Sequence, residues 1–181
     1  MSHQRILRQR ASSWPSLCEC VPFSYWAYYL IRLRILVEFV ADLFPESGLL
    51  PTDPVQRAKT RFFIEAIWVK YVSPVIGWFR RGEPGAAVVD GAVALEALLE
   101  GKFALGDHFT VADIGHAPFL LRADVLFKHM PDGESVLQQL KERAPRFWQY
   151  SQDVKARPSV SSTWHVVSCY MRAASCVIAE R

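Results

Sequence analysis

The sequence predicts an all-α protein built around a single core. Apolar residues recur at helical spacing through the stretches 54–81 and 86–100, and no stretch shows the sustained two-residue alternation that is typical of a strand. Turn-forming Gly and Pro separate the helical stretches, as in Gly82-Glu83-Pro84-Gly85 and Met130-Pro131-Asp132-Gly133. With 181 residues, of which 51% are hydrophobic, the chain can bury a core without a disulfide or a cofactor.

The helix boundaries follow from Pro, Gly and capping signals. Residues 45–53 form the one convincing linker, which separates an amphipathic helix ending near Phe44 from a helical bundle. Pro54 suits the first turn of a long helix, in which Pro74 predicts a kink. The expected helices of the bundle are 54–81, 86–100, a capped helix from Val111 to near Lys128, 135–143 and 145–157.

The start of the helix at Val111 is the most informative local signal. Thr110 and Asp113 have the spacing of a capping box, and Phe109 and Ile114 occupy the two positions of a hydrophobic staple. An apolar run follows at 117–121, which predicts a helix that is buried on nearly all sides. By themselves these four residues predict a well-capped core helix and no contact with a substrate.

The segment Phe109-Thr-x-Ala-Asp-Ile also resembles the capping box that opens the central helix of the C-terminal domain of cytosolic glutathione transferases. Three further stretches resemble the same family in the same order: Val37-Glu38-Phe39 with Leu43-Phe44-Pro45, Leu50 to Ala58, and Ala156-Arg157-Pro158-Ser159-Val160 with Trp164. The resemblance covers Leu36 to Trp164. It implies a helical domain over 54–181, a linker over 45–53, and an N-terminal remnant of a thioredoxin-like domain, irregular except for one helix, over 1–44.

An active member of the family needs a thioredoxin-like half that binds glutathione and activates its thiol. Residues 1–44 are too few for that domain's sheet and helices. Where the family carries a Glu-Ser pair that holds the γ-glutamyl carboxylate at a helix N-terminus, this chain has Arg32-Leu33. The resemblance therefore implies an incomplete glutathione site. It implies glutathione as a possible co-substrate, and we expect no cofactor.

Cys20 is a weak candidate for a catalytic nucleophile. Cysteine-type members of the family place a Cys directly before Pro-Phe at a helix start, where the helix dipole favours the thiolate. Here Val21 takes the position before Pro22, and Cys20 lies one residue further away. Alternatively, Val21-Pro22 resembles the family's cis-proline step. The four cysteines lack metal-ligand spacing, and no metal site is expected.

One face of the long helix is the candidate for substrate binding. In the family this face lines the pocket of the hydrophobic acceptor substrate together with the C-terminal tail, to which Trp164 would belong. The competing interpretation is that the aromatic stripe packs in the core. The candidate residues at helical spacing are Trp68, Val72, Val75 and Phe79.

Three functions remain open at this stage. The first is a non-catalytic helical module that binds an apolar ligand or a protein. The second is a glutathione transferase that conjugates or reduces small electrophiles. The third is a truncated or mis-spliced product without an independent function. The first is favoured because the glutathione site is incomplete. The resemblance also implies a homodimer through the first half of the long helix, with the residues Gln56, Arg57, Lys59 and Thr60 toward the interface.

Charge and hydropathy limit the partners further. The net charge of +3 is mild and the charges are interspersed, so nucleic-acid binding is not expected. Charges interrupt the apolar run 24–44, so we expect no membrane span there. The expected location is the cytoplasm. The alternative is a mitochondrial presequence, since Arg5, Arg8 and Arg10 occur without an acidic residue in the first eighteen positions.

Overall fold

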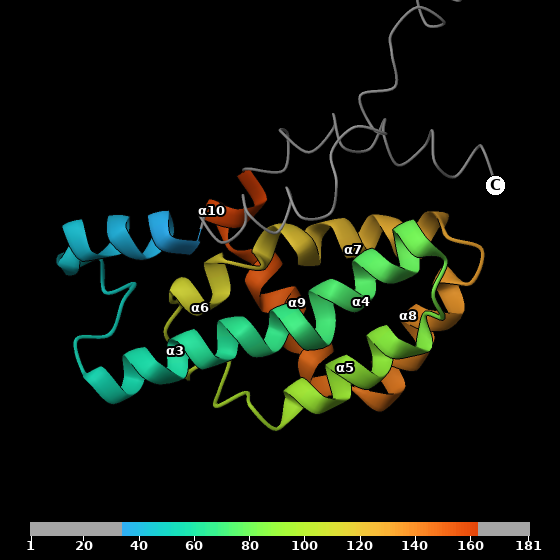
Figure 1. Cartoon of the computed structure of the whole chain (residues 1–181), viewed down its shortest axis with the longest axis horizontal. Helices are drawn as coiled ribbons and strands as arrows, with labels where there is room; N and C mark the ends of the chain where they lie inside the picture. The colour runs from blue at the N-terminus through green and yellow to red at the C-terminus, as the bar shows by residue number, and fades with distance from the viewer. Residues whose placement is uncertain (1–33, 163–181) are drawn as a thin grey trace, which may run out of the picture. The chain divides into compact units, whose positions relative to one another are not determined.

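A computed structural model of the chain describes residues 34–162. The described residues from Leu36 onward belong to one compact unit. All the regular elements of the described part are helical, apart from one isolated bridge between Phe103 and Gly106 (Figure 1). The predicted all-α class is therefore confirmed for this part of the chain.

The long helix forms as predicted between Pro54 and Arg81, but its second half is wound differently. It consists of α3 (Pro54–Ile67), the π-helical η2 (Trp68–Val72), α4 (Ser73–Ile76) and the π-helical η3 (Gly77–Arg81), which run on as one rod in Figure 1. Pro74 has no N–H to donate to the Lys70 carbonyl, so the regular i to i−4 bonding cannot continue through it. The expected kink thus takes the form of wider turns on either side of Pro74.

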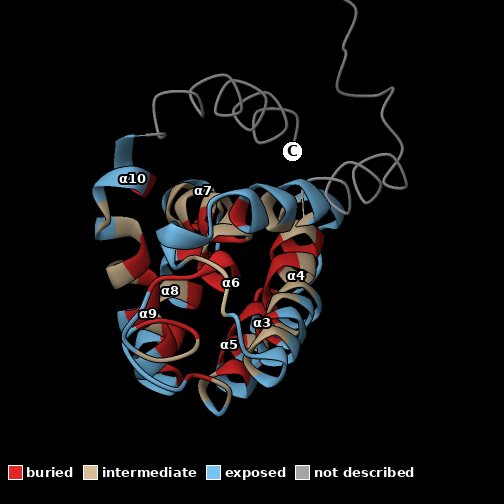
Figure 2. Cartoon of the chain, turned by 90° about the vertical axis from the view of Figure 1, so that its left-hand side faces the viewer, coloured by how far each residue is buried: buried red, intermediate tan, exposed pale blue. Residues whose placement is uncertain are grey.

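The remaining helices pack around this rod. They are α5 (Ala86–Glu96), α6 (Val111–Ile114), α7 (Ala117–His129), α8 (Gly133–Arg143), α9 (Pro145–Ala156) and the single-turn α10 (Pro158–Ser161). The linker carries a short 3-10 turn, η1 (Pro45–Ser47), and ends at Asp53, whose carboxylate caps α3 by accepting from the Gln56 N–H at 2.8 Å. In Figure 2 the buried sides of the rod and of α5, α6, α8 and α9 face a shared interior.

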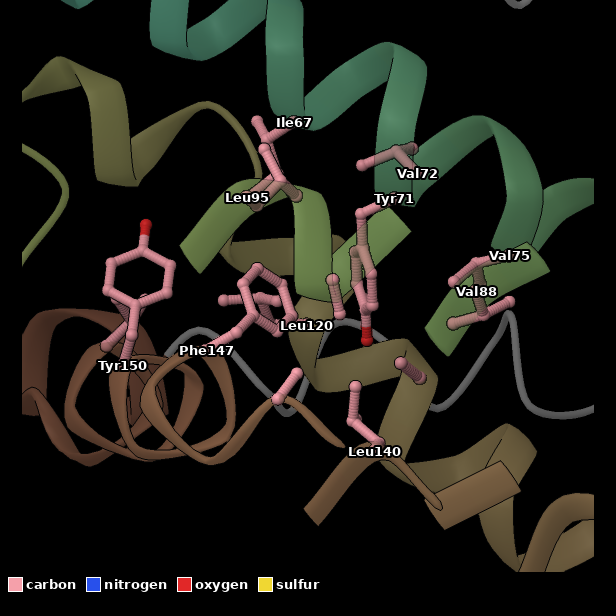
Figure 3. Packing of buried hydrophobic residues seen from close by; sticks show 14 of the residues in the cluster. Ile67, Tyr71, Val72, Val75, Val88, Leu95, Leu120, Leu140, Phe147 and Tyr150 are labelled. Atoms are coloured by element: carbon pink, nitrogen blue, oxygen red, sulfur yellow. The ribbon is translucent and has the colours of Figure 1, made fainter. Parts of the chain in front are cut away.

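The core lies between the rod, α5, α7, α8 and α9. The Tyr71 and Phe147 rings pack with centroids 4.8 Å apart, and Figure 3 shows them between Leu95, Leu120 and Leu140. Residues 54–81 are apolar and long enough to cross a membrane by length and composition alone. In this fold, however, Phe63, Ile67 and Tyr71 on that rod are buried in the bundle core.

The helix after Val111 differs from its prediction in two respects. It is broken at Gly115 and His116 into α6 and α7, because Pro118 cannot donate to the carbonyl of Ile114. It is also buried on one side only. Within α7 the buried side chains are Ala117, Leu120, Ala123, Leu126 and Phe127, at helical spacing, whereas Phe119, Leu121 and Arg122 are half-buried.

Residues 34–43 are helical, and ion pairs link Glu38 and Asp42 to α3. Glu38 accepts from the Arg61 Nε at 3.1 Å, and Asp42 pairs with Arg57. The polar side of this helix thus faces α3, while Leu36, Phe39 and Leu43 are exposed. The division of the chain at residues 44 and 53 stays a prediction.

Candidate functional site

The candidate site is an aromatic face where η2 meets α7. The rings of Trp68 and Phe119 meet edge to face, with centroids 5.6 Å apart and an interplanar angle of 82°. The Arg122 guanidinium lies 5.1 Å from the centroid of Phe119, within the range of a cation–π contact. All three side chains are half-buried, so this face is apolar, partly accessible and positively charged at one edge.

The predicted stripe on the long helix divides between this face and the core. Val72 and Val75 are buried among the core side chains. Trp68 and Phe79 are half-buried and pack against the core from outside. Trp68 and Phe79 are therefore the described members of the stripe with surface left for a ligand, and Trp164 lies outside the described residues.

Sequence reasoning missed Phe119 and Arg122. The run at 117–121 indicated a helix buried on nearly all sides, so it offered no reason to single out a surface aromatic residue on it. The available signal was the three-residue spacing of an aromatic and a cationic residue, which places both on one helix face. Their contact with Trp68 could not be predicted, because it joins residues 51 positions apart in the sequence.

A second polar cluster lies at the start of α6. Here the predicted capping box forms, and the Asp113 carboxylate accepts from the Thr110 N–H at 2.9 Å. The same carboxylate also accepts from the Ala104 N–H at 3.0 Å and from the Tyr150 hydroxyl at 2.9 Å. Phe109 is buried and Ile114 packs against the core, as the two staple positions require.

His116 extends this cluster through Tyr150. The Tyr150 hydroxyl gives its hydrogen to Asp113, so its oxygen accepts from the His116 Nε2, and the imidazole is neutral with its proton on Nε2. The His116 Nδ1 makes no hydrogen bond of ordinary geometry to the described residues. Burial lowers the pKa of His116 to about 3, against a smaller opposing effect of the Ala112 carbonyl.

The buried cluster has a structural role. Burial raises the pKa of Asp113 although several donors surround the carboxylate, and burial together with Asp113 raises the pKa of Tyr150 well above its usual value. Asp113, His116 and Tyr150 are almost completely buried, so no substrate can reach them. Among residues 34–162 no group of His, Cys, Asp and Glu has the arrangement of a metal site, and the candidate nucleophile Cys20 lies outside that range.

Comparison with known proteins gives one consistent family. Residues 85–153 match the family model of the glutathione S-transferase C-terminal domain. The probable maleylacetoacetate isomerase of Caenorhabditis elegans is 32% identical over 104 residues, which cover 49% of this chain and 48% of that protein. This chain thus spans about half the length of that relative.

Solved structures of glutathione transferases share the fold. Omega 1C of Trametes versicolor is 38% identical with a TM-score of 0.72, and the match covers 80% of this chain and 65% of that one. Omega 2S of the same species, solved in complex with 2,4-dihydroxybenzophenone, is 35% identical with a TM-score of 0.67, over 77% of this chain and 64% of that one. Residues 85–153 therefore carry the C-terminal helical domain of the glutathione transferase family, and the described part of the chain shares the fold of that family's solved members.

Proposed function

We propose that the helical domain binds an apolar aromatic molecule on the face formed by Trp68, Phe79 and Phe119. The observation that carries this proposal is the half-buried, edge-to-face pair of Trp68 and Phe119 beside the Arg122 guanidinium. Aromatic rings bind further rings in offset or edge-to-face geometry, and each such pair contributes about 0.5 to 1.5 kcal/mol beyond the area it buries. A flat, apolar ligand with an electron-rich edge suits this face.

The solved relative supports the same class of ligand. Trametes versicolor Omega 2S was solved with 2,4-dihydroxybenzophenone, a molecule with two aromatic rings and phenolic hydroxyls. Rings of this kind would pack against Trp68 and Phe119, and a phenolic oxygen would interact favourably with the Arg122 guanidinium. This makes the compound a suitable first probe for the present chain.

We propose further that the helical domain binds without turnover. Conjugation of glutathione needs a group that favours the thiolate, since a free thiol with a pKa near 8.5 is only a few per cent ionised at neutral pH. Within residues 34–162 there is no cysteine, and the phenols of Tyr71 and Tyr150 are buried, with raised pKa values. The alternative is an active glutathione transferase that uses residues outside this range, with Cys20 as the first to test.

We propose that the protein is located in the cytoplasm, as the family resemblance implies. We also propose that the chain forms a homodimer, as the same resemblance implies. Of the residues predicted to lie toward the interface, Gln56 is half-buried, Thr60 is buried and Arg57 pairs with Asp42. Lys59 is exposed, so it is the member of that group best suited to an interface.

The binding face would be tested by titrating the full chain with 2,4-dihydroxybenzophenone in a calorimeter. Trp68→Leu and Phe119→Leu keep an apolar side chain but remove a ring, and each should raise the dissociation constant about tenfold, or about 1.4 kcal/mol. Trp148→Phe is the matched control. Trp148 is another half-buried tryptophan in cation–π contact, but it lies on α9 between Lys141 and Lys155. Equal losses in all three variants would contradict the proposed location.

A further inference from the structure

Two cations lie against one pair of buried aromatic rings just before α6. The rings of Phe103 and Phe109 meet edge to face, with centroids 5.4 Å apart and an interplanar angle of 80°. The Arg157 guanidinium carbon lies 4.1 Å from the centroid of Phe109 and 5.9 Å from that of Phe103. The Lys102 ammonium lies 5.7 Å from the centroid of Phe103. All three distances are in the range of a cation–π contact, and we call these four residues the Arg157 cluster.

The backbone of Arg157 is held in place between α9 and α10. It has φ −64° and ψ 132°, the extended conformation that a residue before proline favours. Its N–H donates to the Val154 carbonyl at 3.3 Å, and its carbonyl accepts from the N–H groups of Val160 and Ser161 at 3.0 and 2.9 Å. The side chain therefore extends from a fixed point to the ring of Phe109.

The loop that carries Lys102 is held by its own hydrogen bonds. The Phe103 N–H donates to the Gly106 carbonyl at 2.7 Å, and the Glu100 N–H donates to the Ala104 carbonyl at 3.2 Å. Gly106 has a φ of 115°, a conformation that other residues rarely adopt, so glycine is needed at this turn. The loop therefore places the exposed Lys102 directly beside a fixed and buried ring.

The Arg157 guanidinium has no acceptor within residues 34–162. None of these residues accepts a hydrogen bond from it, and its Nε is buried without a partner among them. Asp153 lies four positions earlier but forms no ion pair with Arg157 in the described part of the chain. The pattern differs at four other arginines, each of which pairs with a carboxylate: Arg57, Arg61, Arg81 and Arg143.

Lys102 is likewise without a carboxylate partner among the described residues. Glu100 is two positions before it, but the Glu100 carboxylate pairs with Lys59 at 2.8 Å. Asp107 accepts from the backbone N–H of Lys102 and does not pair with its ammonium. Two positive charges thus lie beside one ring pair with no anion of the described chain to neutralise either.

We propose that the Arg157 cluster binds an oxyanion, the carboxylate or phosphate group of a small ligand. A guanidinium that contacts a ring through its face keeps its N–H groups available in its own plane. These groups form a fork that fits two oxygens of one carboxylate or phosphate. Lys102 supplies a second positive charge beside the same rings. The proposal does not depend on the aromatic ligand proposed above, since Trp68 and Phe119 take no part in it.

The rings contribute to the strength and the selectivity of the site. Phe103 and Phe109 keep water away from one side of the guanidinium, and a charge-assisted hydrogen bond is stronger where water is excluded. A bound oxyanion would also supply an acceptor for the buried Nε of Arg157. A lysine ammonium is a point charge without a fork, so it could not replace the guanidinium in this geometry.

The first test is an NMR titration of the full chain with sodium phosphate to about 50 mM, with sodium chloride adjusted to keep the ionic strength constant. The signals to follow are the Nε–H of Arg157 and the backbone N–H groups of Lys102 and Arg157. We expect them to shift and saturate, with a dissociation constant on the order of 1 to 10 mM. Shifts that do not saturate, or that are no larger than those of the Arg143 signals, would overturn the proposal.

Matched substitutions locate the site. Arg157→Lys keeps the charge but removes the fork, and should raise the dissociation constant for phosphate at least about fivefold. Lys102→Gln removes the second charge and should raise it about threefold. Arg143→Gln is the control, because it removes the charge of an exposed arginine that pairs with Asp90 on α5, and it should leave the dissociation constant unchanged.

Circular dichroism would check that each variant folds. Lys102 is exposed, so Lys102→Gln keeps the test decisive even where Arg157→Lys does not fold. Equal affinity in the wild type and in both cluster variants would overturn the site. Equal losses in these two variants and in Arg143→Gln would show a general attraction to positive charge, and would overturn the proposed location.

A second titration distinguishes the two kinds of oxyanion, with sodium acetate in place of phosphate under the same conditions. Phosphate carries more negative charge, so two cations should bind it more tightly than acetate. This result would assign a phosphate-bearing ligand to the Arg157 cluster, whereas equal or tighter binding of acetate would assign a carboxylate-bearing one. Binding of neither anion would overturn the proposal and would leave the aromatic face of Trp68 and Phe119 unaffected.

Discussion

Glu96 and Arg146 cap each other's helices. The Glu96 Oε1 accepts from the N–H groups of Arg146 and Phe147, at 2.6 and 3.0 Å, in the first turn of α9. The Arg146 guanidinium in turn donates to the Leu99 carbonyl at 2.9 Å, just beyond the end of α5. Helix N-termini favour an anion and C-termini a cation, so each charge lies at the end that suits it. The pair therefore holds the end of α5 against the start of α9, next to the buried Phe147 side chain.

Replacing Glu96 should therefore destabilise the bundle although the residue is only half-buried. Ala144, the residue before α9, offers no side-chain cap of its own. We expect Glu96→Ala to lower the free energy of unfolding by about 1 to 2 kcal/mol. Urea denaturation would measure this. Glu142→Ala, at an exposed glutamate on α8, is the control and should change the stability little.

Asp113→Ala should be more damaging than the loss of a helix cap alone. The substitution removes the acceptor of the Thr110 and Ala104 N–H groups and of the Tyr150 hydroxyl, all in a buried position. Each buried donor left without a partner costs about 1 to 3 kcal/mol, so we expect a total loss of about 3 to 5 kcal/mol. Asp107→Ala, at an exposed aspartate nearby, should have little effect. An Asp113→Ala protein with the wild-type melting temperature would contradict the role given to this carboxylate.

His116 makes the stability of the fold depend on pH. Its pKa is lowered from 6.5 to about 3 in the folded state, so the unfolded chain takes up a proton first as the pH falls. The contribution of His116 is complete above pH 6.5 and is lost below it, by about 1.4 kcal/mol per pH unit until the folded pKa is reached. The raised pKa of Asp113 acts with the opposite sign, because the folded state then binds the proton more tightly.

A non-titrating substitution separates the two effects. His116→Gln keeps an N–H donor toward Tyr150, so its stability relative to the wild type should improve as the pH is lowered from 7 to 5, by up to about 2 kcal/mol. His108→Gln, at an exposed histidine, is the control. Denaturation curves at several pH values would test this. A difference between wild type and His116→Gln that does not change with pH would exclude a neutral, buried imidazole.

Gly91 should tolerate no side chain. A Cβ atom there would lie 1.5 Å from the Lys70 carbonyl oxygen, the group that Pro74 leaves without its regular helical partner. We expect Gly91→Ala to destabilise the protein by about 3 kcal/mol or more, since neither backbone can move freely. Gly115→Ala is the matched control. Its Cβ would meet the Val111 carbonyl at an ordinary 3.7 Å, and thermal unfolding should be nearly unchanged.

Structural features that depend only on residues close together in the sequence could be predicted. The capping box at Thr110 and most helix boundaries are local, and they form as expected. Contacts between distant residues could not be predicted in this way. The mutual caps of Glu96 and Arg146 join positions 50 apart, and the Trp68–Phe119 pair joins positions 51 apart. Local pattern carries no information on which helix faces meet.

The most direct test of the central claim measures binding and turnover on one preparation of the full chain. Calorimetric titrations with 2,4-dihydroxybenzophenone and with glutathione would be paired with a conjugation assay on a standard electrophile. The account predicts binding of the aromatic compound, weak or no binding of glutathione, and conjugation no faster than the protein-free reaction. Tight binding of glutathione with turnover well above that reaction would contradict it, and Cys20 would then be the first residue to mutate.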